Sequence, residues 1–495
     1  MDQDPQLLEG LAVHLLNGLT KETSGLCNRG GRKNMKMKTK WLAILLVLGL
    51  VLAACGGDDA ADTTEAETPD TTEAEAPDTT EAEAPDTTEA EAMILTDIGV
   101  DLEAGTITVG LLSDLTGVFS ALVQPVVTGY EAQIEAINAA GGIHGLNIIL
   151  EVRDTGYSVD THVQQYNEIR DSVVALGHST GSPHTVAIKD QLAEDDMLAI
   201  PLTWYSGWSD PALNANLVPH GTPYCLESMN TIGYIVSQNP DAATIAIASN
   251  AGDFGQDSAQ GAKIAAEALG LEVVYDGEAK INAADEATLA EVANGIIGSG
   301  ADIVWVTTSP GAYSGIYGQA LAAGVLATWS GSFVAWNFGF LGEESPIRDA
   351  IQRDWIFAYP ISPWSADTPG SAAARELIQA YDPDAPAYEY YLEGVVEAQL
   401  LEVILNAAYD SGDLTRAGVL AAAENLEFMS WDGLAPDQSF VGEPNDIVQR
   451  TVTIVRPSAA DLEAGGSGLA VVEADYTSDI AAAYQFDKTC FDAFG

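Results

Sequence analysis

The residues best suited to chemistry lie in short loops that directly follow apolar runs of the sequence. Residues 177–181, Gly-His-Ser-Thr-Gly, follow Val173–Leu176 and fit the G-x-S-x-G pattern, in which a serine on a strand-to-helix turn attacks an ester. That chemistry also requires an acid and then a histidine later in the chain. After Ser179 the only histidines are His184 and His220, so the usual triad cannot be completed. The loop is therefore predicted to bind a ligand, and a serine hydrolase using Ser179 stays an alternative.

The hydroxyl groups of this loop precede a helix that is predicted to begin near Pro183. Free N–H groups at a helix N-terminus suit a carboxylate or amide oxygen, and Ser179 and Thr180 could either contact such a ligand or only cap the helix. Residues 203–208, Thr-Trp-Tyr-Ser-Gly-Trp, follow a further apolar run. Aromatic side chains crowded there indicate a partly apolar or planar ligand, although each of them is equally compatible with packing in the core.

The sequence contains four cysteines, Cys27, Cys55, Cys225 and Cys490. They form no C-x-x-C pair and none lies near a cluster of histidines, so we predict no metal site. Cys225 and Cys490 could form a disulfide in an oxidising compartment, and two separate buried thiols are the other possibility. The apolar run that opens the folded part leads into Ser113–Gly117 and not into a G-x-G-x-x-G turn, so a dehydrogenase has no support and we expect no cofactor.

Length and charge limit the classes of function that are possible. The chain has 495 residues, which suits two lobes of ordinary size plus an extension. Its formal net charge is -54 and it has only 19 Lys and Arg residues. Because phosphate binding depends on Lys and Arg, we expect no nucleic acid partner.

The N-terminal region has the features of a secretion signal. Lys36–Lys40 is basic, Trp41–Leu52 is apolar, and Leu-Ala-Ala-Cys follows, ending at Cys55. This pattern predicts a signal peptide at 35–54 and resembles a bacterial lipobox, which implies a lipid anchor on Cys55 and a place on the outer face of the cell membrane. Residues 1–34 would then be a non-native upstream extension. If they are instead a functional cytoplasmic segment, the apolar run is an internal anchor.

An acidic segment separates this signal from the rest of the chain. The eight-residue unit Thr-Thr-Glu-Ala-Glu-Ala-Pro-Asp repeats with one variation from Thr63 to Ala92. Its like charges, its recurring proline and its lack of large apolar residues predict an extended tether. We assign the tether to residues 55–104.

From Thr106 onward, short apolar runs alternate with segments of helical periodicity, which is typical of an α/β fold with parallel sheets. The alternation begins again after Tyr224. We therefore predict two doubly wound lobes. Because helices in Ser371–Leu426 are needed to cover the first sheet, the chain must cross between lobes more than once. The assigned ranges are 105–226 plus 363–446 for lobe 1 and 227–362 plus 447–495 for lobe 2.

Several stretches resemble one protein family in their order and spacing. Thr106–Gly142, TITVGLLSDLTGVFSALVQPVVTGYEAQIEAINAAGG, is similar to the opening of periplasmic-type solute-binding proteins of the branched-chain amino acid class, and Asp253–Gly255, Ala301–Val304 and Glu393–Gly394 agree with it. The resemblance implies the type 1 periplasmic-binding-protein fold, with two Rossmann-like lobes joined by a three-stranded hinge. It also implies a small-molecule solute in the cleft, an ABC permease as partner and a monomer.

The resemblance and the loops together give a set of candidate ligand-binding residues. They are Phe119, Ser120, Ser179, Thr180, Thr203, Trp204, Phe254, Tyr313 and Phe333. In amino-acid binders of this class an acidic residue near Ser330–Asn337 pairs with the ligand ammonium, and that stretch has no carboxylate here. Asp253 or Glu227 could substitute for it, because a buried ammonium needs a partner.

We therefore expect an extracytoplasmic substrate-binding protein of an ABC importer, without enzymatic activity. Its expected ligand is an amino acid or a related small polar solute, such as an amide, a urea-like compound or an aromatic acid. A ligand that touches both lobes would favour the closed form. A solute-sensing lipoprotein that signals to a membrane receptor is an alternative with the same ligand chemistry.

Overall fold

The computed structural model describes residues 93–492. The predicted upstream extension, signal peptide, lipid anchor at Cys55 and the acidic repeat lie outside the described residues. Within the part that is described, every helix is too short or too polar to cross a membrane.

The end of the range 55–104, which we assigned to the tether, belongs to the folded part. There, β1 (Leu95–Thr96) pairs with β12 (Asp413–Leu414), and β2 (Val100–Asp101) pairs with β3 (Thr106–Ser113). The reason is that apolar side chains in this stretch pack against the main core. The folded part thus begins about ten residues earlier than the composition indicates.

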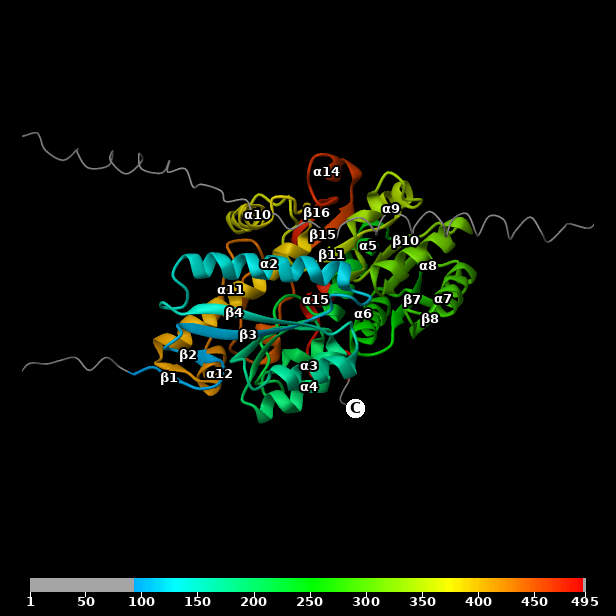
Figure 1. Cartoon of the computed structure of the whole chain (residues 1–495). Helices are drawn as coiled ribbons and strands as arrows, with labels where there is room; N and C mark the ends of the chain where they lie inside the picture. The colour runs from blue at the N-terminus through cyan, green and yellow to red at the C-terminus, as the bar shows by residue number, and fades with distance from the viewer. Residues whose placement is uncertain (1–92, 493–495) are drawn as a thin grey trace, which may run out of the picture. The chain divides into compact units, whose positions relative to one another are not determined.

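The first lobe is built on a five-stranded sheet in the order β2-β3-β5-β6, with β4 beside β3. Its other strands are β4 (Asn147–Asp154), β5 (Ala175–Thr180) and β6 (Leu198–Leu202), all parallel to β3. Helix α2 (Ser120–Ala139) lies on one face, and α3 (Val159–Ile169) and α4 (Ser182–Glu194) lie on the other (Figure 1). The carboxyl ends of these strands therefore meet at one edge, where ligand-binding loops of α/β folds gather.

The second lobe repeats this plan with a four-stranded parallel sheet in the order β10-β9-β7-β8. Helices α5 and α6 pack together on one side, and α7 and α8 pack together on the other. The strands are β7 (Thr244–Asn250), β8 (Glu272–Ile281), β9 (Ile303–Thr307) and β10 (Thr328–Gly331). The helices are α5 (Tyr224–Gln238), α6 (Asp253–Leu269), α7 (Glu286–Ser299) and α8 (Pro310–Ala322).

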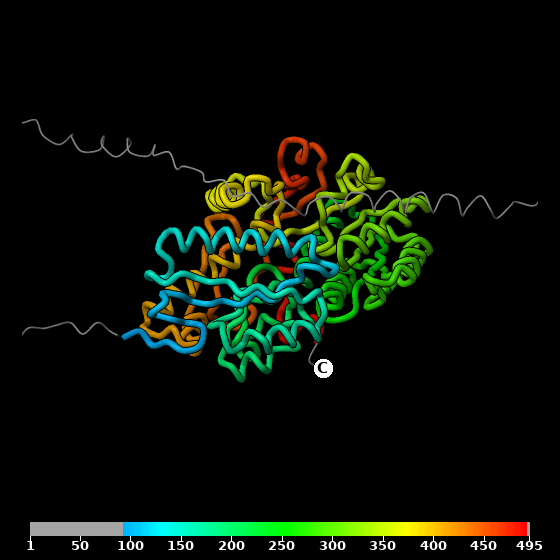
Figure 2. Tube along the Cα trace, in the orientation of Figure 1, coloured from blue at the N-terminus to red at the C-terminus, as the bar shows by residue number. Residues whose placement is uncertain are grey.

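The chain then returns to the first lobe, as the helical pattern predicted. Helix α11 (Glu389–Asp410) packs along α2 and contacts β5, so segments far apart in sequence lie side by side (Figure 2). After it the chain reaches β15 (Val452–Pro457), which pairs with β11 (Phe357–Tyr359) and β16 (Leu469–Tyr476) in a separate antiparallel sheet. The remaining elements are α9 (Arg348–Asp354), α10 (Pro369–Tyr381), α12 (Arg416–Glu424), β13 (Phe428–Met429), β14 (Gln438–Ser439), α13 (Pro444–Ile447), α14 (Ala459–Glu463) and α15 (Asp479–Ala483), with 3-10 turns η2 (Ser206–Ser209), η3 (Phe333–Ala335) and η4 (Phe338–Leu341).

Two glycines allow α2 and α11 to cross at very short range. A Cβ atom added to Gly129 would lie 1.9 Å from the Tyr391 carbonyl oxygen, and one added to Gly394 would lie 1.9 Å from the Val126 carbonyl oxygen. Only hydrogen fits at such positions. This crossing brings Val126 of α2 and Tyr390 of α11 to the same cavity.

Three connections join the lobes, and hydrogen bonds tie the first of them to the third. They follow β6, follow β11 and precede β15. Gln438 accepts from the Gly221 N–H at 3.1 Å and donates to the Pro219 carbonyl at 3.1 Å, and the Thr222 hydroxyl donates to the Thr451 carbonyl at 2.8 Å. The predicted pair of doubly wound lobes with a three-part hinge is confirmed.

Candidate ligand-binding site

A cavity of about 40 Å³ lies where the carboxyl ends of the strands in the two lobes face each other. Lobe 1, including α11, contributes Phe119, Leu122, Val123, Val126, Tyr157, Thr180, Gly181, Ser182, Leu202, Trp204 and Tyr390, and lobe 2 contributes Tyr224, Phe254 and Val334. Four of the predicted residues are among them, namely Phe119, Thr180, Trp204 and Phe254. The lining is mostly apolar, and the described residues that form it include no Arg or Lys.

A buried aspartate shapes the first loop of the cavity. Asp114 accepts hydrogen bonds from the backbone N–H groups of Gly117 at 2.5 Å and Phe119 at 2.8 Å, and burial raises its pKa. These bonds turn the chain so that α2 begins at Ser120 and the Phe119 ring faces Tyr157, with ring centroids 4.6 Å apart. Ser120 itself donates to the Gly117 carbonyl at 2.8 Å, so the structure uses its hydroxyl to close the turn.

A chain of aromatic rings crosses the cavity from one lobe to the other. Phe119 meets Phe254 edge to face at 5.8 Å, and Phe254 meets Tyr224 in the same way at 4.9 Å. On the other side of Tyr224 lies Trp204, at 6.0 Å. Such edge-to-face pairs are more stable than the buried area alone would make them. The rings form one wall of the cavity, against which an apolar ligand could pack.

The polar part of the cavity is the start of helix α4. Gly181 precedes the helix with φ 93°, and Ser182 and Pro183 form its first turn. Because Pro183 has no N–H, the donors of this turn are the N–H groups of Ser182 and His184, which have no partner within the helix and can bind an anion. Ser182 lines the cavity, and its hydroxyl forms a hydrogen bond with that of Thr203. Ser182 was not predicted, although the Gly-Ser-Pro helix start was a usable signal.

Two of the predicted hydroxyl residues are placed differently along β5. Thr180 faces the cavity and its hydroxyl lies 2.6 Å from His178 Nε2. Because successive side chains of a strand point to opposite faces, Ser179 points toward α3 and α4, where its hydroxyl lies 3.2 Å from His162 Nε2 and 2.8 Å from the Thr185 hydroxyl. Ser179 is fully buried there, and burial lowers the pKa of His162 to about 3.

The remaining predicted residues lie behind the cavity wall. Thr203 is buried and does not line the cavity, but its side chain forms hydrogen bonds with two residues that do, Ser182 and Tyr224. The Phe333 ring packs edge to face on Trp204 at 4.8 Å. Tyr313 lies inside lobe 2, stacked on Trp355 at 4.4 Å, so the structure does not bring it to the cavity.

Two buried carboxyl groups stand on the lobe 2 side. Asp253 is 3% exposed, its Oδ2 has no hydrogen-bond partner among the described residues, and burial raises its pKa to about 7. Its charge also acts on Tyr157 and Tyr224, both of which line the cavity. Burial likewise raises the pKa of Glu227 to about 8, although its Oε1 accepts from the Phe333 N–H at 2.6 Å. These are the two acids that the sequence offered as substitutes.

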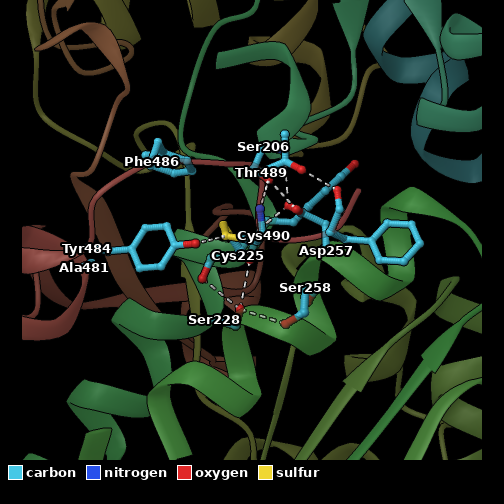
Figure 3. Close-up of a disulfide and its surroundings, with 12 residues drawn as sticks. Ser206, Cys225, Ser228, Asp257, Ser258, Ala481, Tyr484, Phe486, Thr489 and Cys490 are labelled. Carbon is cyan, nitrogen blue, oxygen red and sulfur yellow. Dashed lines mark hydrogen bonds between the residues drawn. A yellow bond between two sulfur atoms is a disulfide. The ribbon is translucent and has the colours of Figure 1, made fainter. Parts of the chain in front are cut away.

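A disulfide between Cys225 and Cys490 fixes the C-terminal tail beside this site (Figure 3). The Cys490 N–H donates to the Ser206 hydroxyl at 3.0 Å, and Ser206 donates in turn to Asp257 through its hydroxyl and through its N–H at 3.2 Å. Asp257 also accepts from the Cys225 N–H at 3.3 Å. The sequence left this pairing open. The two sulfurs and a carboxylate oxygen of Asp257 lie within 4.8 Å of one another, but the sulfurs are bonded to each other.

Comparison with known proteins agrees with this fold. The family described as "Periplasmic binding protein" matches residues 106–461, which is most of the chain. The chain belongs to this family. The sequence resemblance is therefore confirmed, and no curated protein matches the chain.

Solved structures share the fold of this periplasmic binding protein. A fatty acid ABC transporter substrate-binding protein from Thermomonospora curvata is 26% identical with a TM-score of 0.72, covering 79% of this chain and 97% of its own. A branched chain amino acid ABC transporter protein from Thermus thermophilus with bound valine is 19% identical with a TM-score of 0.62, covering 76% and 98%. A branched-chain amino acid binding protein from Streptococcus pneumoniae in complex with isoleucine is 17% identical with a TM-score of 0.60, covering 75% and 99%.

Proposed function

We propose that this chain is the extracytoplasmic substrate-binding protein of an ABC importer, which holds a small solute between its lobes and closes over it. The observation that carries the proposal is the cavity itself, because residues from both lobes line it. A ligand there would contact both lobes at once and would shift the population toward the closed form. Family membership supports the same role.

Among the ligands expected from the sequence was an aromatic acid, and we propose the wider class of carboxylic acids with an apolar body. The first turn of α4 offers N–H groups and the Ser182 hydroxyl to a carboxylate. The apolar body would lie against Phe119, Val126 and Phe254, where urea or a small amide would leave the aromatic wall unused. The similarity to a fatty acid binder at 26% identity supports this class, and binders of valine and isoleucine share the fold.

An α-amino acid is the second candidate, and a separate observation favours it. Asp253 has an oxygen without a partner among the described residues and lies beside the cavity wall. A ligand ammonium would supply that partner and would favour the ionised carboxylate, because an opposite charge nearby lowers a carboxyl pKa. Valine and isovalerate differ only by this ammonium, so they separate the two candidates.

We further propose the lipid anchor at Cys55, an ABC permease as partner and a monomeric state, as the sequence indicates. A sensor that signals to a membrane receptor would bind the same ligand, and identifying its neighbour in the membrane would distinguish the two roles. The hydrolase alternative finds little support, because Ser179 is buried on the far side of β5 and its neighbour His162 also has an Nδ1 without a partner among the described residues.

Titration calorimetry tests the proposal with the full chain carrying Cys55→Ser, which prevents lipid attachment. The ligands are isovalerate, valine, phenylacetate, octanoate and urea. We expect at least one acid to bind with a Kd in the micromolar range, to be recovered unchanged, and to bind at least 100-fold more tightly than urea. Binding of urea alone, or of none of the five, would contradict the proposed ligand class, and consumption of the ligand would contradict the binding role.

A further inference from the structure

A second cavity, of about 450 Å³, lies directly behind Trp204. We call it the hinge chamber, because its walls come from the connections that join the lobes, including Val218, Gly221, Phe440 and Val448. Trp204 lines both the hinge chamber and the cavity between the lobes. Within the described part of the chain, Trp204 is the one residue that the two linings share.

The sizes of the two spaces are very different. Ligand sites usually measure about 300–1,000 Å³. The interlobe cavity, at about 40 Å³, is far below this range, while the hinge chamber, at about 450 Å³, lies within it. Even a small amino acid would need more room than the interlobe cavity gives as it stands, so the lobes must part to admit one, and a long apolar chain would need further space still.

For the two spaces to join, the Trp204 ring would have to turn while its backbone stays in place. The Trp204 carbonyl accepts from the Tyr224 N–H at 2.7 Å, which holds the main chain. The ring is bounded by edge-to-face contacts with Phe333 at 4.8 Å and with His220 and Tyr224 at 6.0 Å, and turning it would exchange these contacts for contacts with the ligand. Gly221, with φ +74°, leaves the space that the indole needs, since a Cβ there would lie 2.7 Å from its Nε1.

We infer that the hinge chamber is a second compartment of the ligand site, which takes the far end of an extended apolar acid whose carboxylate lies at the start of α4. This inference rests on the proposed function. Trp204 would turn aside to join the two compartments. The chamber offers apolar walls for such a chain, among them Leu217, Val218 and Phe440. Val441, a further lining residue, is 52% exposed and marks the open side.

A series of straight-chain acids, from butanoate through octanoate and dodecanoate to hexadecanoate, tests the inference by calorimetry on the full chain with Cys55→Ser. Because a buried methylene contributes about 0.8 kcal/mol, each one that enters the chamber should tighten Kd about fourfold. We expect the affinity to rise with length beyond butanoate. We also expect one molecule to bind per chain.

Ala215→Trp fills the chamber from its rim, and Leu213→Trp is the matched control. Ala215 is exposed and lines the chamber, whereas Leu213 is 63% exposed and lies two residues away, outside the lining. Ala215→Trp should weaken dodecanoate binding at least tenfold and change butanoate binding less than threefold. Leu213→Trp should change neither. Val441→Glu, also at the rim, should repeat the selective loss.

The possible failures are distinguishable. If affinity stops rising at butanoate, or if both chamber variants bind every acid as the control does, the chamber takes no part and the inference is wrong while the proposed function stands. If two molecules of dodecanoate bind per chain, the chamber is an independent site and the inference is also wrong. If no acid of any length binds, while the short ligands above also fail, the proposed ligand class itself falls.

Discussion

The two walls of the interlobe cavity differ in the chemistry that they offer. The lobe 1 wall presents hydrogen-bond donors, namely the first turn of α4 and the hydroxyls of Thr180 and Ser182. Behind the aromatic rings of lobe 2 stand carboxyl groups instead, Asp253 and Glu227, whose pKa values are raised by burial to about 7 and about 8. The lobes share a fold plan but have unlike sites. A ligand with an anionic end and a second, different end would therefore be oriented by the cleft.

The two walls are also held in place by different means. On the lobe 1 side, the glycine crossing of α2 and α11 sets the positions of Val126 and Tyr390. On the lobe 2 side, Asp257 and the Cys225–Cys490 disulfide connect α5, α6, the C-terminal tail and the loop at Ser206. The lobe 1 wall thus depends on two helices that pack closely at glycines. The lobe 2 wall depends on a buried polar network and a covalent bond.

The largest effect should follow from breaking the close packing. Gly394→Ala places a Cβ against the Val126 carbonyl oxygen and should lower the free energy of unfolding by about 3 kcal/mol, because overpacked cores must shift their backbone. Chemical denaturation measures this change in the free energy of unfolding. Gly298→Ala in α7 is the control, since a Cβ there meets nothing within 4 Å, and should raise stability by about 0.5–1 kcal/mol. Equal effects of the two changes would refute the packing argument.

The next effect concerns the donors of the lobe 1 wall. Ser182→Asp puts a negative charge where the ligand carboxylate should lie, and we expect isovalerate or octanoate to bind about 100-fold more weakly, which corresponds to ~2.7 kcal/mol. Asp253→Asn on the opposite wall should leave these acids within threefold of the unchanged protein. It should weaken valine about tenfold if the amino acid is the ligand. If an acid binds the Ser182→Asp variant with unchanged affinity, its carboxylate does not lie at the start of α4.

The buried network of lobe 2 predicts a smaller, pH-dependent effect. Burial raises the pKa of Asp257 to about 7, so the folded state holds a proton that the unfolded state loses near pH 4. The stabilisation is complete below that pH and disappears as the pH rises through about 7. Asp257→Asn cannot titrate, so its stability relative to the unchanged protein should increase by about 1–3 kcal/mol between pH 5 and pH 8.

A surface aspartate provides the control for this measurement. Hydrogen bonds from the Ala243 N–H and from Thr244 lower the pKa of Asp302, so its stabilisation is lost only below the unfolded pKa. Asp302→Asn should therefore shift the unfolding curve equally at pH 5 and pH 8. If Asp257→Asn gives the same flat difference, the Asp257 carboxyl is ionised throughout that range and the argument from burial is wrong.

The sequence indicated the architecture because apolar periodicity records which faces are buried. The alternation was expected to begin again after Tyr224, and α5 (Tyr224–Gln238) opens the second lobe there. Strand β10 (Thr328–Gly331) was not predicted from the sequence, because it is only four residues long and contains Ser and Gly, which carry little apolar pattern. The start of the folded part was also placed too late, since β1 and β2 are two residues each.

The site was harder to predict, because sequence gives neighbours along the chain and not the direction of side chains. Thr180 and Ser179 were proposed together, and the alternation of β5 separates them onto opposite faces. Tyr313 follows a strand of lobe 2, as a cleft residue would, but stacking on Trp355 keeps it in the interior. Asp253 and Glu227 were recognised by charge alone. That each has one carboxylate oxygen without a hydrogen-bond partner among residues 93–492, and that both are buried, becomes visible only in the structure.

The smallest expected effect compares the two faces of β5 directly. Ser179→Ala removes a hydroxyl that meets His162 and Thr185 and should change ligand affinity less than twofold, because nothing of Ser179 reaches the cavity. Thr180→Val keeps the shape but removes a hydroxyl beside the ligand, so affinity for the same acid should fall about three- to tenfold, the range of one neutral hydrogen bond. Titration calorimetry with both variants measures these two affinities. A loss confined to Ser179→Ala would mean that β5 presents its other face to the ligand.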